Sequence, residues 1–190
     1  MKRIIFSLMI VMMAFTATAQ NDVTKFLGIP VDGTKAEMIR KLKAKGFTPS
    51  PYDKDILTGE FNGRDVRISI QTINNKVWRL IVADESPTTE TNIRIRFNNL
   101  CEQFNNSSKY ITSLSDQTIP QTEDISYQMS VNSKRYEALF FQRPENSTLL
   151  YDYNENKYVW FTIIESSYST NFYIAIYYEN GYNAANGEDL

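Results

Sequence analysis

The chain has 190 residues, with 20 basic and 22 acidic side chains, one cysteine and no histidine. The lack of histidine excludes Ser-His-Asp and Cys-His catalysis and His-ligated zinc, and a single cysteine excludes an intramolecular disulfide. The slight acidic excess gives the chain no electrostatic reason to bind nucleic acid.

The first residues have the pattern of a secretory signal peptide. Residues 2–3, Lys-Arg, precede an apolar run over residues 4–15, and residues 16–19, Thr-Ala-Thr-Ala, supply the small-x-small cleavage pattern. The apolar run is shorter than the roughly 20 residues that a membrane-spanning helix needs. We therefore expect cleavage between Ala19 and Gln20, removal of residues 1–19, and a periplasmic or secreted protein that does not span a membrane.

A first helix is predicted over residues 35–45. Thr34 and Glu37 have the spacing of a capping box, in which each side chain accepts a hydrogen bond from the other residue's backbone N–H. Met38, Ile39 and Leu42 then follow at helical spacing, and Gly46 is suited to the C-terminal cap.

Three strands are predicted next, over residues 56–61, 65–71 and 77–83. Residues 62–63, Asn-Gly, are among the strongest two-residue hairpin signals, and residues 74–75, Asn-Asn, predict a second turn. In the middle strand, apolar and polar residues alternate, which indicates that one face of the strand is buried.

A second helix is predicted to begin with Ser86 as N-cap and Pro87 at its first position, and to end near residues 105–108. Cys101 lies on its apolar stripe, so we expect the thiol to be buried. The later predicted elements are a loop over 112–124, a strand over 125–131, a turn at Asn132-Ser133, strands over 134–142, 158–164 and 172–178, a weaker strand candidate over 149–153, and a polar tail over 181–190.

The order of helix, hairpin and further strand occurs twice, and short segments of the two halves are similar. Residues 61–66, Phe-Asn-Gly-Arg-Asp-Val, resemble residues 131–136, Val-Asn-Ser-Lys-Arg-Tyr, and residues 75–78 resemble residues 156–160. Turn chemistry alone produces some of this similarity. We interpret the pattern as an internal duplication.

The sequence therefore predicts a single α+β domain over residues 20–190, with a polar C-terminal tail. Two tandem units of a helix and an antiparallel sheet are expected, over about residues 25–85 and 86–180. Helices would pack on one face of the sheet and leave the other face partly open.

Residues 32–39, Asp-Gly-Thr-Lys-Ala-Glu-Met-Ile, followed by three strands, resemble the repeat unit of the β-lactamase inhibitor protein-like fold and of small outer-membrane lipoproteins of the assembly-machinery type. Ala19-Gln20 and the closing residues 178–183 and 186–190 resemble uncharacterised exported proteins of Bacteroides-type bacteria. The fold resemblance implies protein–protein binding through the open sheet face and assigns no specific residues. The missing lipobox cysteine departs from the lipoprotein pattern.

Candidate catalytic and metal-binding residues are few. The acidic pairs Asp84-Glu85 and Glu123-Asp124 have the residue types of a glycosidase, but their positions at turns favour solvated acids. Residues 152–156 match the first three ligand positions of an EF-hand loop, whereas Lys157 and Ile163 stand where glycine and glutamate are required. The sequence accordingly predicts no enzyme activity, no metal site and no cofactor.

Aromatic residues supply the candidate binding surface. Ten of the twelve tyrosines lie after residue 120, and since tyrosine favours strands, most of them are interpreted as sheet packing. Residues 158–161 are aromatic on both faces of their strand, and Tyr177 and Tyr178 cannot both be buried on one side. The predicted surface residues are Tyr136, Tyr158, Trp160, Tyr173, Tyr177 and Tyr178.

Three functions follow from these features, in order of preference. The first is an exported, non-catalytic protein that binds an envelope or extracellular protein on its open aromatic sheet face. The second is a carbohydrate- or small-ligand-binding protein that uses the same face. The third is an enzyme that uses carboxylates and tyrosines alone.

Overall fold

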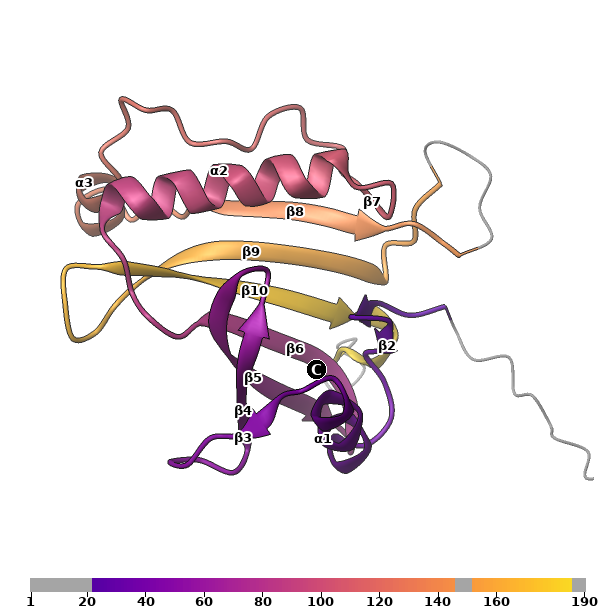
Figure 1. The fold of residues 1–190 in the computed structure, drawn as a ribbon. Helices are drawn as coiled ribbons and strands as arrows, with labels where there is room; N and C mark the ends of the chain where they lie inside the picture. Colours follow the sequence, from indigo (N-terminus) through magenta and orange to yellow (C-terminus); the bar gives the residue numbers. More distant parts are fainter. Residues whose placement is uncertain (1–21, 146–151, 186–190) are drawn as a thin grey trace, which may run out of the picture.

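The computed structural model describes residues 22–145 and 152–185 (Figure 1). The predicted signal peptide, residues 149–151 of the weaker strand candidate and residues 186–190 of the tail lie outside these ranges. Within them, no helix is both long enough and apolar enough to cross a membrane.

The described chain forms short and long strands together with helices on one side of them. In chain order the elements are β1 (Lys25–Phe26), β2 (Ile29–Pro30), α1 (Lys35–Ala44), β3 (Thr48–Pro49), β4 (Ile56–Phe61), β5 (Arg64–Ile73), β6 (Lys76–Asp84), α2 (Glu90–Asn106), β7 (Tyr110–Ile111), α3 (Ile125–Ser130), β8 (Glu137–Gln142), β9 (Lys157–Glu165), β10 (Phe172–Asn180) and the 3₁₀-helix η1 (Gly181–Asn183).

A large antiparallel sheet organises the molecule and confirms the α+β class. Its eight strands lie in the order β3-β4-β5-β6-β10-β9-β8-β7, and β1 and β2 form a separate two-stranded sheet. The first and second halves of the chain meet where β6 pairs with β10, from Arg79 opposite Glu179 to Ala83 opposite Ala175. Each half contains a long helix followed by four strands of this sheet, with α3 between β7 and β8 in the second half, and both halves contribute to one continuous sheet.

Both long helices lie on one face of the sheet. Figure 1 shows α1 against the half formed by β5 and β6, and α2 running along the half formed by β8, β9 and β10. Met38 and Leu42 of α1, Phe97 of α2, Leu80 of β6 and Phe161 of β9 belong to one buried core cluster. In β5, β8 and β9 buried residues alternate with partly or fully exposed ones, so the opposite face of the sheet remains open at these strands.

The N-terminal segment is fastened to the C-terminal strand β10. The hydroxyl of Thr24 donates a hydrogen bond to the carbonyl of Glu179, and the Asn180 side chain donates to the carbonyl of Val31 at 2.8 Å. The ammonium of Lys157, whose side chain is almost fully buried, forms an ion pair with Asp22 at 2.7 Å. These contacts fix the β1–β2 hairpin beside the middle of the sheet.

Both outer edges of the sheet are short and protected. At one edge β3 has two residues and ends at Pro49, which has no N–H to donate. At the other edge the Gln117 side chain bonds the backbone of Leu139, accepting from its N–H at 2.7 Å and donating to its carbonyl at 3.3 Å. Such capped edges offer little backbone to an added strand.

The local signals of the first half are confirmed. Thr34 and Glu37 form the predicted capping box at the start of α1. Asn62-Gly63 joins β4 to β5, and Asn74-Asn75 joins β5 to β6, with positive φ at all four residues, as the tight hairpin turns between right-handed twisted strands require.

The predicted start of the second helix is wrong by about one turn. The helix begins at Glu90 with Thr89 as its N-cap, and not at Ser86-Pro87. Thr88 exchanges two backbone hydrogen bonds with Phe172, at 2.7 and 2.8 Å. This pairing keeps the backbone at Thr88 extended. The helix can therefore begin only after Thr88.

The predicted strand over residues 125–131 is also wrong, because residues 125–130 form the short helix α3. The side chain of Asp124 accepts from the Tyr127 N–H at 2.8 Å, and Glu90 of α2 accepts from the Ile125 N–H at 2.9 Å. Both bonds satisfy N–H groups that a helix start leaves free. Of the alternating apolar residues only Ile125 is buried.

The segments whose similarity suggested a duplication occupy different places in the fold. Residues 62–63 form a hairpin, whereas Asn132 and Ser133 follow the end of α3, so the predicted turn between two strands at residues 132–133 is wrong. Residues 75–78 open β6, whereas residues 156–160 open β9. In the strand order, β6 corresponds to β10 and β5 to β9. The regularity lies in the order of elements and not in the matched residues.

Candidate functional site

The centre of the open face is built from two cross-strand rows of side chains. Strand alternation directs residues of β6, β10, β9 and β8 away from the helices. The first row is Arg79, Glu179, Tyr158 and Phe141, and the second is Ile81, Tyr177, Trp160 and Leu139. Apart from Glu179, which is buried, all of these residues are partly exposed. The centre of this face is thus aromatic and apolar, with one acidic side chain, Glu179, and one basic side chain, Arg79.

Trp160 and Tyr177 form the central feature of this surface. They are directly opposite each other on β9 and β10, with ring centroids 3.9 Å apart and planes at 4°. Side chains on a strand stand roughly perpendicular to the sheet. Two rings stacked across neighbouring strands therefore present their edges outward and their faces to each other.

The buried carboxylate of Glu179 holds one ring of the stacked pair, that of Trp160. Its side chain is 2% exposed and accepts from Trp160 Nε1 at 2.6 Å and from the Arg79 guanidinium at 2.7 Å. The Tyr158 hydroxyl also bonds this carboxylate; burial and the neighbouring Glu179 together raise the pKa of Tyr158. Three donors on one buried carboxylate fix the orientation of two rings of β9 and of the Arg79 side chain of β6.

Arg79 completes the cluster from β6. Its guanidinium lies 3.9 Å from the centroid of the Trp78 ring and 5.3 Å from that of Tyr177, which are cation–π distances. The Nε atom of Arg79 is buried and has no hydrogen-bond partner among the described residues. Within the described part of the chain, one buried donor of this cluster therefore has no acceptor.

The six residues predicted as a binding surface fall into two groups. Tyr158, Trp160 and Tyr177 come together at the centre of the open face, and Tyr173 lies on the same face opposite Ile164, towards the β9–β10 turn. The other two, Tyr136 and Tyr178, are buried, so their prediction as exposed surface residues is wrong.

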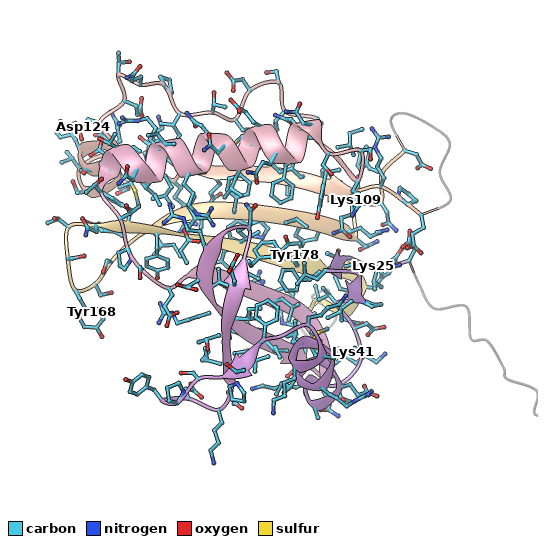
Figure 2. The ribbon with its side chains drawn as sticks, in the orientation of Figure 1. Lys25, Lys41, Lys109, Asp124, Tyr168 and Tyr178 are labelled. Atoms are coloured by element: carbon cyan, nitrogen blue, oxygen red, sulfur yellow. The ribbon has the colours of Figure 1, made fainter. Side chains whose placement is uncertain are left out.

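Tyr178 is 3% exposed and belongs to the helix-covered face, where its ring contacts Phe26 at 4.9 Å between centroids. Figure 2 shows Tyr178 in the interior, beside the hairpin that carries Lys25. Tyr136 is 6% exposed, and its hydroxyl donates to Glu123 at 2.7 Å. Tyrosine content alone could not separate these two from the exposed rings.

Sequence reasoning also missed five residues of the two rows: Arg79, Ile81, Leu139, Phe141 and Glu179. A signal for one of them exists in the sequence. Glu179 follows seven residues without a charged side chain, from Phe172 to Tyr178, in a predicted strand, and a charge in such a run is seldom buried unless it is paired. Its partner, Arg79, comes from a strand a hundred residues away in the chain, which no local pattern connects to it.

The acidic pairs considered for catalysis make structural contacts. Asp84 accepts two hydrogen bonds from Arg96, both at 2.7 Å. Glu123 accepts from Lys134 and from Tyr136, and these bonds, with that of Lys134 the stronger, lower its pKa. Residues 154–157 form the turn before β9, and the described residues contain no group of three or more acidic or cysteine side chains placed to hold a metal ion.

No protein-family model, no curated protein and no solved structure matches this chain. The chemistry of the open face is therefore the basis from which its function is inferred.

Proposed function

We propose that this chain is an exported, non-catalytic binding protein that holds an envelope or extracellular protein on the open sheet face around Trp160 and Tyr177. The observation that carries the proposal is the stacked pair of rings, in which the buried carboxylate of Glu179 fixes Trp160 and stacking holds Tyr177 against it. Rigid aromatic side chains in a partly apolar surround are the usual anchors of protein interfaces. Their fixed orientation lowers the conformational entropy that binding costs.

The ring geometry favours a protein over a carbohydrate as the occupant. A sugar stacks on the exposed face of an aromatic ring, but the facing sides of Trp160 and Tyr177 cover each other at 3.9 Å. The ridge that results is bordered by Ile81 and Leu139. Such a ridge fits an apolar groove of a partner protein, whereas it gives a sugar only ring edges.

Export and the two-unit arrangement belong to the same proposal. The pattern of residues 1–19 supports export to the periplasm or beyond. The occurrence of a helix and four strands in each half, with β6 and β10 side by side, supports two tandem units of the β-lactamase inhibitor protein-like kind. The absence of histidine from the sequence supports a binding role over an enzymatic one.

Capture of partners by variants of the protein from Gln20 onward tests the proposal. Immobilised protein would be exposed to envelope extract of the source organism, and captured proteins would be identified by mass spectrometry. Leu139→Lys puts a charge into the second row without touching Glu179, and Trp160→Ala removes one ring. Tyr168→Ala is the matched control, since Tyr168 is 99% exposed in the β9–β10 turn (Figure 2).

The proposal predicts a partner that the unmodified protein and Tyr168→Ala retain equally. Leu139→Lys and Trp160→Ala should each weaken binding by about 30-fold or more, as the loss of an interface hot spot does. Circular dichroism would verify that both variants stay folded. A partner retained equally by all four proteins would place the interface elsewhere and contradict the proposal.

A glycan array tests the carbohydrate alternative with the same proteins and with a further variant, Tyr177→Ala. Binding of a glycan that Tyr177→Ala abolishes and Tyr168→Ala preserves would overturn the protein-binding proposal in favour of carbohydrate. No glycan binding, together with a partner lost on substitution of Trp160, supports it.

A further inference from the structure

A groove lies on the other face of the molecule, between the β4–β5 hairpin and α2. It has a volume of about 370 Å³, which is within the range of small-molecule sites, roughly 300–1,000 Å³. Most of its lining is apolar or aromatic. The apolar and aromatic residues are Leu27, Phe61, Leu100, Phe104, Tyr110, Ile176 and Tyr178.

Leu27 stands at this groove in an unusual conformation. It forms the β1–β2 turn with Gly28, and both residues have positive φ, 51° for Leu27 and 78° for Gly28. A branched apolar residue seldom adopts this region. The Leu27 side chain is 42% exposed instead of joining the core, so an apolar group is held at the groove where solvent reaches it.

A second, polar hollow of about 250 Å³ adjoins the groove and shares three lining residues with it: Asn62, Leu100 and Gln103. Asn62 at the hairpin donates to Gln103 of α2 at 2.9 Å, which bridges the two elements at the junction. The polar hollow is lined in addition by Arg64, Asn92, Ile95, Arg96 and Asn99. Amide and guanidinium groups thus lie at one end of an apolar groove.

The polar hollow carries one unneutralised positive charge. Arg96 is held by the bidentate contact with Asp84, whereas Arg64 forms no ion pair with any acid of the described chain. Arg64, Val66 and Ile68 occupy alternate positions of β5, and the side chains of Val66 and Ile68 are buried on the helix-covered face. The Arg64 side chain therefore lies on this face too. Glu60 is the one acid among the lining residues of the two compartments, and it lines the apolar one.

We propose that this groove binds a small anionic amphiphile. Its carboxylate or phosphate head would contact Arg64 and the amides of the polar hollow, because Arg64 supplies planar donors and an uncompensated charge. Its apolar body would lie against Leu27, Phe104 and Ile176. The site lies on the face opposite the Trp160–Tyr177 surface and does not depend on partner binding there.

Isothermal titration calorimetry with decanoate, hexanoate and decylamine tests the assignment on the chain from Gln20 onward. Decanoate should bind with a Kd below about 1 mM. Hexanoate should bind more weakly by about fourfold for each methylene removed from the groove. Decylamine has a tail longer by one methylene and the opposite charge, so it should bind at least tenfold more weakly than decanoate in spite of its longer tail.

Arg64→Gln should weaken decanoate binding by about tenfold or more, the worth of hydrogen bonds to a charged group. Arg67→Gln is the matched control, since Arg67 lies on the same strand but between Val66 and Ile68, so that its side chain belongs to the open face. This variant should bind decanoate as the unmodified protein does. Leu27→Ser should weaken decanoate and decylamine by the same factor. Thermal melts of each variant establish that the fold is kept.

Decyl phosphate, compared with decanoate, shows whether the site prefers a phosphate or a carboxylate head group. Binding of either anion supports the site if Arg64→Gln weakens it. Failure of both anions to bind at about 1 mM would overturn the proposal, as would equal binding of decanoate and decylamine. A dimer that decanoate does not dissociate, and that Leu27→Ser abolishes, would assign the groove to a second copy of the chain instead.

Discussion

Arg96 and Asp84 join α2 to the end of β6 through a bidentate ion pair, with side chains only 8% and 6% exposed. Lys35 and Asp55 form a pair at similar distance, 2.8 Å, but the acid is 69% exposed. Because the two ion pairs differ in burial, their loss should affect the free energy of unfolding differently. Removing one partner of the buried pair leaves an uncompensated charge without water, whereas the exposed pair is solvated with or without its partner.

Arg96→Met should therefore lower the free energy of unfolding by about 3 kcal/mol or more, and Lys35→Met by less than about 1 kcal/mol. Urea denaturation followed by circular dichroism measures both. The double variant Arg96→Met/Asp84→Leu should recover much of the loss, because it removes the stranded acid. Equal losses for the two single variants would contradict the assigned role of burial.

Cys101 is buried on α2, as its place on the apolar stripe predicted. Burial, with smaller contributions from nearby acids, raises the pKa of its thiol to about 12. Since the thiolate is the reactive form, the native thiol should not react with a disulfide reagent at pH 8. Reaction should begin only as denaturant unfolds the chain, and fast labelling of the native protein would show that the thiol is accessible.

At the scale of elements, α3 depends on one residue of another helix. Glu90, in the first turn of α2, accepts from the backbone N–H groups of Ile125 and Ser126, from the Ser126 hydroxyl and from Arg94. Burial by itself raises the pKa of Glu90, but these bonds outweigh it, and the pKa is lowered in the folded protein. The ionised carboxylate is thus what holds the start of α3.

The lowered pKa of Glu90 gives a pH dependence with a defined sign. A carboxyl group whose pKa is lower in the folded state stabilises the fold above its unfolded pKa, about 4.3, and loses that contribution as the pH falls through the folded value. Glu90→Gln should therefore cost about 1 kcal/mol at pH 7, and the difference from the unmodified protein should shrink below about pH 4.

Denaturation of both proteins between pH 3 and pH 7 measures this difference. Glu102→Gln is the control, because Glu102 is exposed on the same helix and should change stability little at any pH. A cost for Glu90→Gln that stays constant across the range would show that packing, and not the charge, secures α3.

At the scale of the whole molecule, the two halves share one sheet and one core. β6 and β10 pair over five residues, and Phe26 of the N-terminal hairpin packs against both Phe61 of the first half and Tyr178 of the second. A boundary crossed by backbone hydrogen bonds and core rings should not separate on unfolding. We expect one cooperative transition.

The two tryptophans test this directly, since Trp78 lies in β6 and Trp160 in β9. Trp78→Phe and Trp160→Phe each leave a single fluorophore that reports on one half. In each variant, fluorescence and far-UV circular dichroism should give coincident urea midpoints, within about 0.2 M. A fluorescence midpoint that departs from the circular dichroism midpoint in either variant would show that its half unfolds separately.

The elements that the sequence predicted correctly are those whose signals are local. The capping box at Thr34, the Asn-Gly turn after Phe61 and the alternation over residues 66–71 depend on groups within a few residues of one another. The burial of Cys101 followed likewise from the period of its own helix. Backbone conformation at these places is decided by steric preference and by side chains that satisfy nearby N–H groups.

The tertiary structure decided what depends on distant residues. Thr88 pairs with Phe172, so α2 begins later in the chain than predicted. Glu90 accepts from the Ile125 N–H and stabilises a helix, α3, in a segment whose residues alternate as in a strand. The central surface required β6, β10 and β9 to be neighbours, because only that order brings Arg79, Glu179 and Trp160 together. A sequence states which residues are aromatic or charged, but their exposure and partners follow from strand order and register, which are properties of the whole sheet.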